Sequence, residues 1–418
     1  MNVVVSHVYS ADNAGDAAIL SVLLADLRAM DRAAHVTILT IDETPPAATF
    51  DGFDVRPSLM FIALNRVRSR PLKAAYAALV ITGTLASTWL EQRIGVRVPV
   101  GVRLRSILDV YDDADLVVAV GGGYLRGRAG LVSTYELALL LHALLICSLK
   151  GKPVVLHTQS VGPFANQVQT RMAAFVLRRM DLVLAREDIT VDLLAGLGVV
   201  DNVERAVDAA FAFLPESRVD LRAELGIEID RPLVGFTVRR WLAEADQARY
   251  ELAMAGLADH VIARHGADVI FIPQVTSEHH GDDDRVTSRA VAGLMSERPI
   301  VLSQRYDHRQ VKALYGALDL LVGTRFHSVI FALTAGVPAL AIEYEPKTRG
   351  IMRDLGLERW VVPIASATAA GLIDLFDELV AARVSYAERL AGRLPDYEAQ
   401  APIGRRLAAV AALALAVP

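Results

Sequence analysis

An arginine and a histidine stand two positions apart between two apolar runs of this chain. The segment GTRFHS, residues 323–328, follows LYGALDLLV and precedes VIFALTAGVPALAIEY. Arg325 offers a permanent charge and a planar fork of donors for a carboxylate or phosphate, and the imidazole of His327 is a group that can give or take a proton. On a strand the two side chains share one face, and at a helix N-terminus they lie beside free backbone donors. Either placement predicts a site for an anionic, acid-labile group.

The same residues also have structural interpretations. His327 could be a core histidine bonded to the backbone, and Arg325 could be a buried ion-pair partner of Glu343. Glu343 and Lys347 end the next strand, in AIEYEPKTRG, and we take both as candidate binding residues.

A polar loop lies between the first predicted strand and the first predicted helix. In SADNAGDAAIL, Asn13, Gly15 and Asp16 occupy this turn. Gly15 permits close backbone approach, and the helix N-terminus offers N–H groups to an anion. Asp16 could alternatively be only an N-cap. The motif is not G-x-G-x-x-G, so no dinucleotide fingerprint is present here.

Other candidate residues also follow predicted strands. In VAVGGGYLRG, the predicted strand ends in three glycines, Gly121, Gly122 and Gly123. Because glycine has no side chain, a ligand could approach the backbone there. Gln159, in HTQSVGPF, is a polar group that could face a cleft. In VGFTVRRW, Arg239 and Arg240 end the first strand of the second half. They are either a pair of surface arginines or donors that bind an anionic ligand.

One polar run resembles a metal site. IFIPQVTSEHHGDDDR contains five candidate ligands, His279, His280, Asp282, Asp283 and Asp284. Because they are nearly consecutive on a predicted loop, we favour a solvated acidic loop over a divalent-cation site.

These residues need strands and helices to position them. Short runs of Val, Ile and Leu alternate with helical patterns, which predicts parallel sheets buried on both faces. The pattern restarts after a charged segment at 215–232. We predict an α/β fold of two Rossmann-like, doubly wound domains facing a cleft. They span 1–215, with an insertion at about 55–105, and 216–390, and a C-terminal helix at 391–418 could cross back to the first domain.

The composition excludes several classes. The chain has 418 residues, 53% of them hydrophobic, and a net charge of −5, so nucleic acid is not an expected partner. A single cysteine, Cys147, gives no disulfide framework and fits the cytoplasm. The N-terminus predicts a strand and not a signal peptide.

The segment LKAAYAALVITGTLASTWL, residues 72–90, carries no charge after Lys73, and arginines precede it at Arg66, Arg68 and Arg70. We favour a packed helical arm. A peripheral membrane contact through 66–90 is the second interpretation. A membrane span is the third, because the segment is short and diluted by Gly, Thr and Ser.

Taken in order, the motifs resemble the polysaccharide pyruvyl transferase family. They are NAGDAAIL, GGG, QSVGP, RED, DAAF, GTRFH and AIEYEPKTRG, and they spread from residue 2 to about residue 357. The ranges 55–105 and 391–418 carry no family motif.

The resemblance implies a two-domain fold like that of B-type glycosyltransferases. It also implies transfer of pyruvate from phosphoenolpyruvate to two hydroxyls of a saccharide, giving a cyclic ketal. Arg325 and His327 match the family's R-x-H motif, and its further donor-binding arginine is either Arg239 or Arg240. His327 could supply the proton that C3 of phosphoenolpyruvate gains, and Asp16 is a candidate base for the attacking sugar hydroxyl. The scheme requires no metal or cofactor, because guanidinium groups neutralise the donor.

Two other functions stay open. A nucleotide-sugar glycosyltransferase would use the same two domains, because a shared fold does not fix the chemistry. A non-enzymatic glycan-binding scaffold would bind sugar without forming a product. The resemblance suggests a cell-surface acceptor, which could be lipid-linked and would then place the enzyme at the cytoplasmic face of the membrane.

Overall fold

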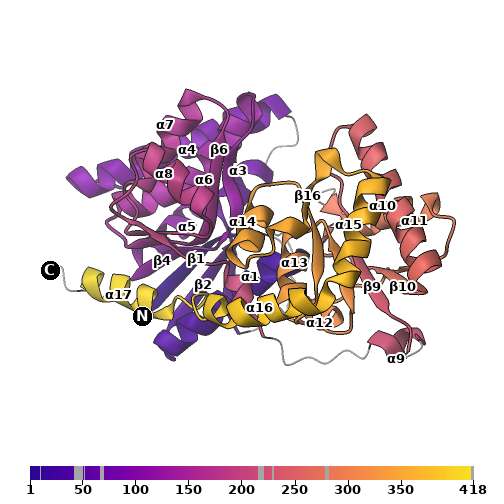
Figure 1. Ribbon diagram of the computed structural model, residues 1–418. Helices are drawn as coiled ribbons and strands as arrows, with labels where there is room; N and C mark the ends of the chain where they lie inside the picture. The colour runs from indigo at the N-terminus through magenta and orange to yellow at the C-terminus, as the bar shows by residue number, and fades with distance from the viewer. Residues whose placement is uncertain are drawn as a thin grey trace. The chain divides into compact units, whose positions relative to one another are not determined.

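The chain forms two compact units in the computed structural model (Figure 1). The structure describes residues 1–9, 11–41, 50, 52–65, 70–214, 221–227, 230–277 and 282–415. Unit 1 comprises Met1–Ala11, Ile19–Ala209 and Pro402–Pro418, and unit 2 comprises Asp12–Ala18 and Ala210–Ala401. The polar loop after the first strand therefore belongs to unit 2, whereas the sequence analysis assigned it to the first half.

Unit 1 is built on a parallel sheet with the strand order β3-β2-β1-β4-β6-β7-β8, and β5 also pairs with β6. The central strands are runs of Val, Leu and Ala that are buried on both faces, as parallel sheets covered by helices require. The strands are β1 (Asn2–Val8), β2 (His35–Thr40), β3 (Asp54–Pro57), β4 (Leu116–Ala119), β5 (Gly122–Gly127), β6 (Val154–Phe164), β7 (Leu182–Ala185) and β8 (Val203–Arg205).

Helices cover this sheet and fill the predicted insertion at 55–105. They are α1 (Ala14–Met30), α3 (Leu59–Asn65), α4 (Arg70–Ile94), α5 (Val102–Asp112), α6 (Leu131–Leu149), α7 (Gln167–Leu177) and α8 (Asp188–Gly196), and the 3₁₀ turn η1 (Ala209–Ala212) follows β8. Among the described residues, α6 alone is long and apolar enough to cross a bilayer. It packs against α4, α7 and β5 and supplies core residues, which is how a central helix of a globular unit behaves.

Unit 2 has the strand order β13-β10-β9-β14-β15-β16, all parallel. Counted along the chain this is 3-2-1-4-5-6, the doubly wound order whose switch point lies between the first and fourth strands. The strands are β9 (Leu233–Thr237), β10 (Asp268–Phe271), β13 (Ile300–Val301), β14 (Leu320–Gly323), β15 (Ala339–Glu343) and β16 (Val361–Pro363), and a separate antiparallel pair is formed by β11 (Thr276–Ser277) and β12 (Asp282–Asp283).

The helices of unit 2 cover both faces of its sheet. They are α9 (Leu221–Leu225), α10 (Glu244–His265), α11 (Asp284–Leu294), α12 (His308–Tyr315), α13 (Phe326–Leu333), α14 (Lys347–Asp354), α15 (Ala369–Ala381) and α16 (Arg383–Glu398), with 3₁₀ turns η2 (Glu358–Trp360) and η3 (Ile364–Ser366). α13 is buried along almost its whole length, which explains its apolar sequence FHSVIFAL.

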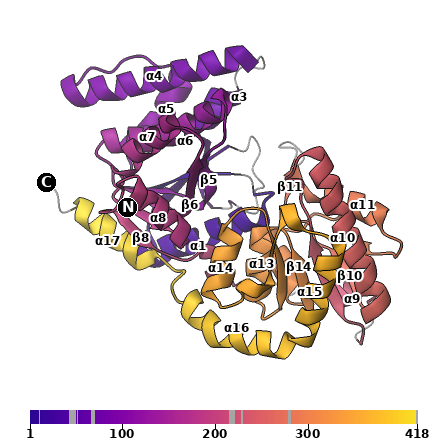
Figure 2. The ribbon, with the colours of Figure 1, turned by 45° about the horizontal axis from the view of Figure 1, so that its top comes forward.

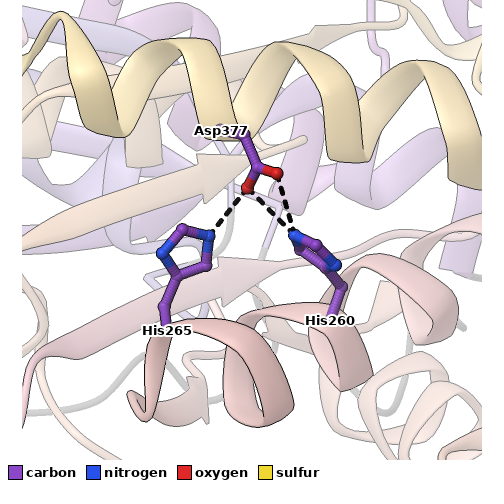
Figure 3. A group of neighbouring side chains, drawn as sticks. All are labelled: His260, His265 and Asp377. Atoms are coloured by element: carbon purple, nitrogen blue, oxygen red, sulfur yellow. Dashed lines mark hydrogen bonds and ion pairs between the residues drawn. The ribbon is translucent and has the colours of Figure 1, made fainter.

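A hydrogen-bonded cluster joins α10 to α15 (Figure 3). Asp377 Oδ1 lies 2.9 Å from Nε2 of His260 and 2.7 Å from Nε2 of His265. Because both histidines belong to α10 and the carboxylate to α15, the cluster fixes these two helices against each other.

The range 391–418 contains the end of α16 and, from Pro402, a segment of unit 1 with α17 (Gly404–Leu415). Polar contacts attach this segment to unit 1. The backbone N–H of Ile403 donates to Asp26 Oδ2 at 2.8 Å, and Arg406 pairs with Glu204 at 3.0 Å.

Candidate active site

Two arginines follow neighbouring strands at the switch point of the unit 2 sheet. β9 ends at Thr237 and β14 at Gly323, and these strands pair with each other. Arg239 and Arg325 each come two residues after a strand end, where open parallel sheets bind their ligands. Thr237 Oγ1 holds the second loop, because it accepts hydrogen bonds from the backbone N–H groups of Thr324 (3.0 Å) and Arg325 (3.3 Å).

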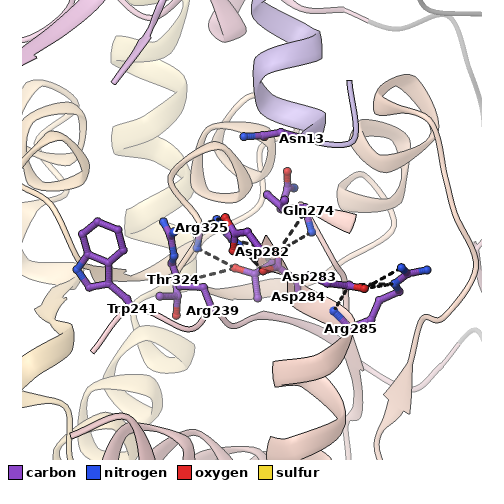
Figure 4. A network of polar contacts seen from close by, with 12 residues as sticks. Asn13, Arg239, Trp241, Gln274, Asp282, Asp283, Asp284, Arg285, Thr324 and Arg325 are labelled. Atoms are coloured by element: carbon purple, nitrogen blue, oxygen red, sulfur yellow. Dashed lines mark hydrogen bonds and ion pairs between the residues drawn. The ribbon is translucent and has the colours of Figure 1, made fainter. Parts of the chain in front are cut away.

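Arg325 lies in a buried network with two carboxylates (Figure 4). Its Nε donates to both oxygens of Asp284, at 3.0 and 3.1 Å, and its Nη2 donates to Oδ1 of Asp284 and of Asp282, at 2.5 Å each. Burial lowers the pKa of the Arg325 guanidinium, but the charges of Asp284 and Asp282 outweigh burial and raise this pKa above its ordinary value. The alternative partner Glu343 instead accepts a hydrogen bond from Arg349 Nη2 at 2.6 Å.

Asp284 is the first residue of α11, and it is only 2% exposed. Its Oδ2 accepts hydrogen bonds from the backbone N–H groups of Gln274 and Val275, both at 3.0 Å. Burial raises the pKa of the Asp284 carboxyl, and the charge of Arg325 opposes this rise. The carboxylate is therefore held in a fixed position from two sides.

The predicted solvated acidic loop is wrong for Asp284, because the β11–β12 pair and the start of α11 direct it into unit 2. Asp283 caps α11 by accepting a hydrogen bond from the backbone N–H of Arg285 at 3.0 Å. The Asp282 side chain is 40% exposed. His279 and His280 lie outside the described residues.

Arg239 is buried and Arg240 is exposed, which separates the two candidate arginines. The Arg239 guanidinium carbon lies 4.6 Å from the ring centre of Trp241 and 4.2 Å from that of Tyr344. Its Nη2 is 3.7 Å from Asp282 Oδ2, and its buried Nε has no hydrogen-bond partner in the described part of the chain. Burial lowers the pKa of Arg239, and Tyr344 opposes this shift. The Nε–H is a donor that an anion could use.

The loop at 12–18 is attached to unit 2 by backbone hydrogen bonds. Asn13 forms an antiparallel bridge with Val275, and the Ala14 N–H donates to the Gln274 carbonyl at 3.0 Å. Gln274 and Val275 also bind Asp284, so the loop and the Arg325 network share one support.

Asn13 caps α1. Its Oδ1 accepts from the N–H groups of Gly15 (3.1 Å) and Asp16 (3.4 Å), and its Nδ2 donates to Asp16 Oδ2 at 2.8 Å. The N–H groups that we expected to bind an anion are thus occupied by Asn13. Asp16 is half-buried and is not the capping residue.

Gly15 lies against the ring of His327. A Cβ atom added to Gly15 would come within 1.9 Å of His327 Nδ1 and 2.2 Å of Cγ. His327 is the second residue of α13, and its ring meets Phe326 edge to face with 5.1 Å between centres. The polar loop and the R-x-H segment therefore meet within one unit.

Lys347 and Tyr344 add two more groups beside the arginines. Lys347 Nζ lies 5.3 Å from the Tyr344 ring centre and pairs with Glu345 at 2.8 Å. Burial raises the pKa of the Tyr344 hydroxyl, but the charges of Lys347, Arg239 and Arg325 outweigh burial and lower this pKa to about 8. A phenol that titrates close to neutral pH thus lies among three cations.

The remaining candidates belong to unit 1. A Cβ at Gly121 would lie 2.6 Å from the carbonyl oxygen of His157, so this glycine is required for packing between neighbouring strands. Gly122 and Gly123 begin β5. Gln159 lies inside β6, is 1% exposed, and donates to the Ser160 carbonyl at 3.2 Å. Its side chain therefore does not reach solvent in this structure.

Sequence reasoning missed three partners of the arginines: Asp284, Trp241 and Tyr344. The Trp241 signal was present, because an aromatic ring two residues after an arginine at a strand end can stack on the guanidinium. The Asp284 pair had no local signal, since Asp284 and Arg325 are 41 residues apart.

The chain is similar to known proteins in sequence and in fold. The family model for polysaccharide pyruvyl transferase matches residues 13–346. The amylovoran biosynthesis protein AmsJ of Erwinia amylovora is 27% identical over 315 residues, which cover 69% of this chain and 73% of that protein.

Solved structures with a similar fold include a UDP-GlcNAc 2-epimerase from Neisseria meningitidis, bound to UDP-GlcNAc. Its TM-score is 0.61 at 10% identity, covering 99% of this chain and 100% of that chain. A glycosyltransferase from Rickettsia africae has a TM-score of 0.61 at 12% identity, covering 100% and 99%. The predicted fold class is confirmed: this is the two-domain α/β fold of B-type glycosyltransferases and related epimerases.

Proposed function

Because this chain belongs to the polysaccharide pyruvyl transferase family, we propose that it transfers pyruvate from phosphoenolpyruvate to two hydroxyls of a cell-surface saccharide. The product is a cyclic ketal, and phosphate is released. The observation that carries the donor assignment is the pair of buried arginines, Arg239 and Arg325, at the switch point of unit 2. Phosphoenolpyruvate has a carboxylate and a phosphate on the same carbon, C2, and planar guanidinium forks bind such groups bidentately.

Arg239, and not Arg240, is our donor-binding arginine. It is buried against the rings of Trp241 and Tyr344, and its Nε–H is not used by the described residues. Arg325 is the second, and its more exposed partner, Asp282, occupies a place that a donor anion would take. Lys347, whose Nζ lies 5.3 Å from the Tyr344 ring centre, supplies a third positive charge. Glu343, paired with Arg349, orders the start of α14.

The proposed reaction balances as follows. C3 of phosphoenolpyruvate gains a proton and becomes a methyl group, and the first sugar hydroxyl adds to C2 and loses its proton. The second hydroxyl then displaces phosphate from C2, and its proton leaves with the phosphate or a base. One proton is therefore taken up at C3 and two are released from hydroxyls, and neither a metal nor a cofactor takes part in this scheme.

His327 is our candidate for the proton delivered to C3, because it follows Arg325 by two residues on the first turn of α13. Asp16 is our candidate base for a sugar hydroxyl. Gly15 brings the loop that carries Asp16 against the His327 ring. A positioned acid or base of this kind contributes about 10²–10⁴-fold to a rate.

The acceptor is assigned to unit 1 by our proposal, with the strand ends at 121–123 as the first place to test. Gln159 contributes there only after a rearrangement, since it is buried. We propose a cytoplasmic enzyme whose partners are phosphoenolpyruvate and a saccharide.

Calorimetry with matched variants tests the donor. Phosphoenolpyruvate at a hundred times its dissociation constant should add about 2.7 kcal/mol to the unfolding free energy. We expect this shift to be lost in Arg239→Ala and kept in Arg240→Ala, whose side chain is exposed. A shift that both variants keep, or none in the wild-type protein, would contradict the donor site.

The second candidate function is a nucleotide-sugar glycosyltransferase. The fold neighbours favour it, since they include an enzyme bound to UDP-GlcNAc. Stabilisation by a nucleoside diphosphate but not by phosphoenolpyruvate, and release of that diphosphate during turnover, would select this function instead.

A further inference from the structure

The helix α4 exposes large apolar residues on its outward side. Its inward side carries two core residues, Ala77 and Val80, and three buried hydroxyl residues, Thr84, Ser87 and Thr88. Its outward side carries Leu79 at 65% exposure and Trp89 at 52%. A surface helix normally places its apolar stripe on the core and its polar residues in water.

Two of these three buried hydroxyls, those of Thr84 and Ser87, bind partners within unit 1. Thr84 Oγ1 lies 2.7 Å from Nε2 of His142 in α6, and Ser87 Oγ donates to the Val98 carbonyl at 3.1 Å. Figure 2 shows α4 running beside α3 and α6 as an outer helix of unit 1. These contacts and the core packing fix the rotation of α4 that leaves Leu79 and Trp89 outward.

The outward residues form one continuous stripe. They recur at spacings of three and four, which places them on one side of a helix: Leu72, Ala75, Leu79, Thr82, Ala86, Trp89 and Arg93. Apolar exposure continues past the helix end, where Ile94 is 65%, Val96 50% and Val102 87% exposed. Water contact of this much apolar surface is unfavourable unless something covers it.

The charges around the stripe favour one kind of binding partner. The described residues from 72 to 105 include five basic side chains, Lys73, Arg93, Arg97, Arg103 and Arg105, and one carboxylate, Glu91. Glu91 is already paired with Arg97 at 2.6 Å and Arg105 at 3.2 Å. A second copy of this chain would bring the same positive charges together, whereas an anionic lipid surface would neutralise them.

We propose that α4 and the segment after it form a membrane-docking surface that lies in the interface of an anionic phospholipid bilayer. Leu72, Leu79 and Trp89 enter the headgroup boundary, and Arg93 and Arg103 meet lipid phosphates. An exposed apolar stripe with basic flanks and a tryptophan is the pattern of interfacial helices. This inference does not depend on the donor or on the reaction, so a failure of one leaves the other standing.

Vesicle co-sedimentation of the full chain tests the docking surface. Vesicles of phosphatidylcholine with phosphatidylglycerol should bind the protein, and vesicles of phosphatidylcholine alone should bind it much less. Binding should weaken as ionic strength rises from about 0.1 to 1 M, because the screening length falls from about 10 to about 3 Å.

Substitutions on the stripe identify the face. Leu79→Glu should weaken binding to the mixed vesicles by about tenfold or more, with an unchanged melting temperature because Leu79 is exposed. Leu252→Glu is the matched control: this leucine is 56% exposed on α10, and its variant should bind like wild type. Arg93→Glu should reduce the preference for the anionic lipid.

Three results would overturn the proposal. The first is no binding to either vesicle, and the second is equal binding by wild type and Leu79→Glu. The third is a lipid-free dimer that Leu79→Glu converts to a monomer, which would assign the stripe to contacts between two copies of this chain.

Discussion

The Cα atom of Gly15 faces the His327 ring so closely that a Cβ atom there would lie 1.9 Å from Nδ1. Real side chains do not approach to this distance, so glycine at this position is a condition for the His327 placement. The contact joins the first turn of α1 to the first turn of α13.

Gly15→Ala should therefore displace His327 and lower turnover by about a hundredfold or more, the size of a lost proton-transfer group. The overpacking should cost about 1–3 kcal/mol of stability. Urea denaturation and phosphate release would measure both effects.

A double-mutant cycle separates this clash from general damage. In a His327→Ala background, Gly15→Ala should cost less stability than in the wild-type protein, because the ring atoms at 1.9 and 2.2 Å are gone and only the Cβ of residue 327, at 2.6 Å, remains. Gly83→Ala in α4, where a Cβ would meet nothing within 4 Å, should be neutral or stabilise by up to about 1 kcal/mol. Full activity in Gly15→Ala would contradict the contact.

The two carboxylates on Arg325 should behave differently when neutralised. Asp284→Asn breaks a buried pair held by two backbone N–H groups, and we expect a loss of about 3–5 kcal/mol. Asp282→Asn removes a partly exposed partner and should cost at most about 1 kcal/mol. The midpoints of urea denaturation would measure both losses of stability, provided that the unfolding free energy of each variant depends on urea with the same slope as in the wild-type protein.

Asp282→Asn should also strengthen phosphoenolpyruvate binding, because a negative charge that competes for Arg325 and Arg239 is removed. Titration calorimetry would detect this change. An unchanged or weaker affinity in Asp282→Asn would show that the carboxylate does not occupy the place of a donor anion.

Tyr344 should ionise close to neutral pH. The charges of Lys347, Arg239 and Arg325 overcome burial and lower its pKa to about 8, against about 10 in the unfolded chain. A depressed pKa means that the phenolate stabilises the fold fully above about pH 10 and that this contribution disappears as the pH falls through about 8.

Phenolate absorbance gives the measurement for Tyr344. A pH titration of the native protein should contain one early step near pH 8 that is missing in Tyr344→Phe and shifted upward in Lys347→Ala. The control Tyr250→Phe should keep the early step, because burial raises the pKa of Tyr250. An early step that survives Tyr344→Phe would assign it to another residue.

The Asp377 cluster predicts an acid-side loss of stability. Burial raises the pKa of Asp377, but its hydrogen bonds to His260 and His265 outweigh burial and lower the pKa below its ordinary value. The stabilisation is therefore present above the unfolded-state pKa of about 3.9 and disappears as the pH falls through the lower folded-state pKa.

Melting temperatures of wild type and Asp377→Asn should thus differ at mildly acidic pH and converge at strongly acidic pH. Asp374→Asn, an exposed carboxylate variant on the same helix, should match wild type throughout. A gap between wild type and Asp377→Asn that persists at the lowest pH would contradict an ionic origin.

The sequence was sufficient for the features that depend on local pattern. Runs such as LVVA at 116–119 and LLVG at 320–323 are strands buried on both faces, and the polar residues after them occupy strand ends. The separation of Arg239 from Arg240 needed the structure, because adjacent residues at the end of a strand differ in burial only once the neighbouring elements are present.

Contacts between residues far apart in the sequence explain the other features that the sequence did not predict. Three consecutive aspartates indicate a solvated loop, since carboxylates are rarely buried without a partner. The partner of Asp284 is Arg325, 41 residues later, and no local pattern joins them. The same reason applies to the loop at 12–18, whose backbone partners are at 274–276.

The path of α1 has a consequence for dividing this protein into parts. Its first turn belongs to unit 2 and the remainder to unit 1, and the chain passes between the units again after Ala209 and after Ala401. A recombinant fragment covering 210–401 would lack the segment that bridges to Val275 and packs on His327. Neither half is a transplantable module, so exchanging halves between homologous enzymes would have to carry residues 12–18 with the second half, as a separate piece.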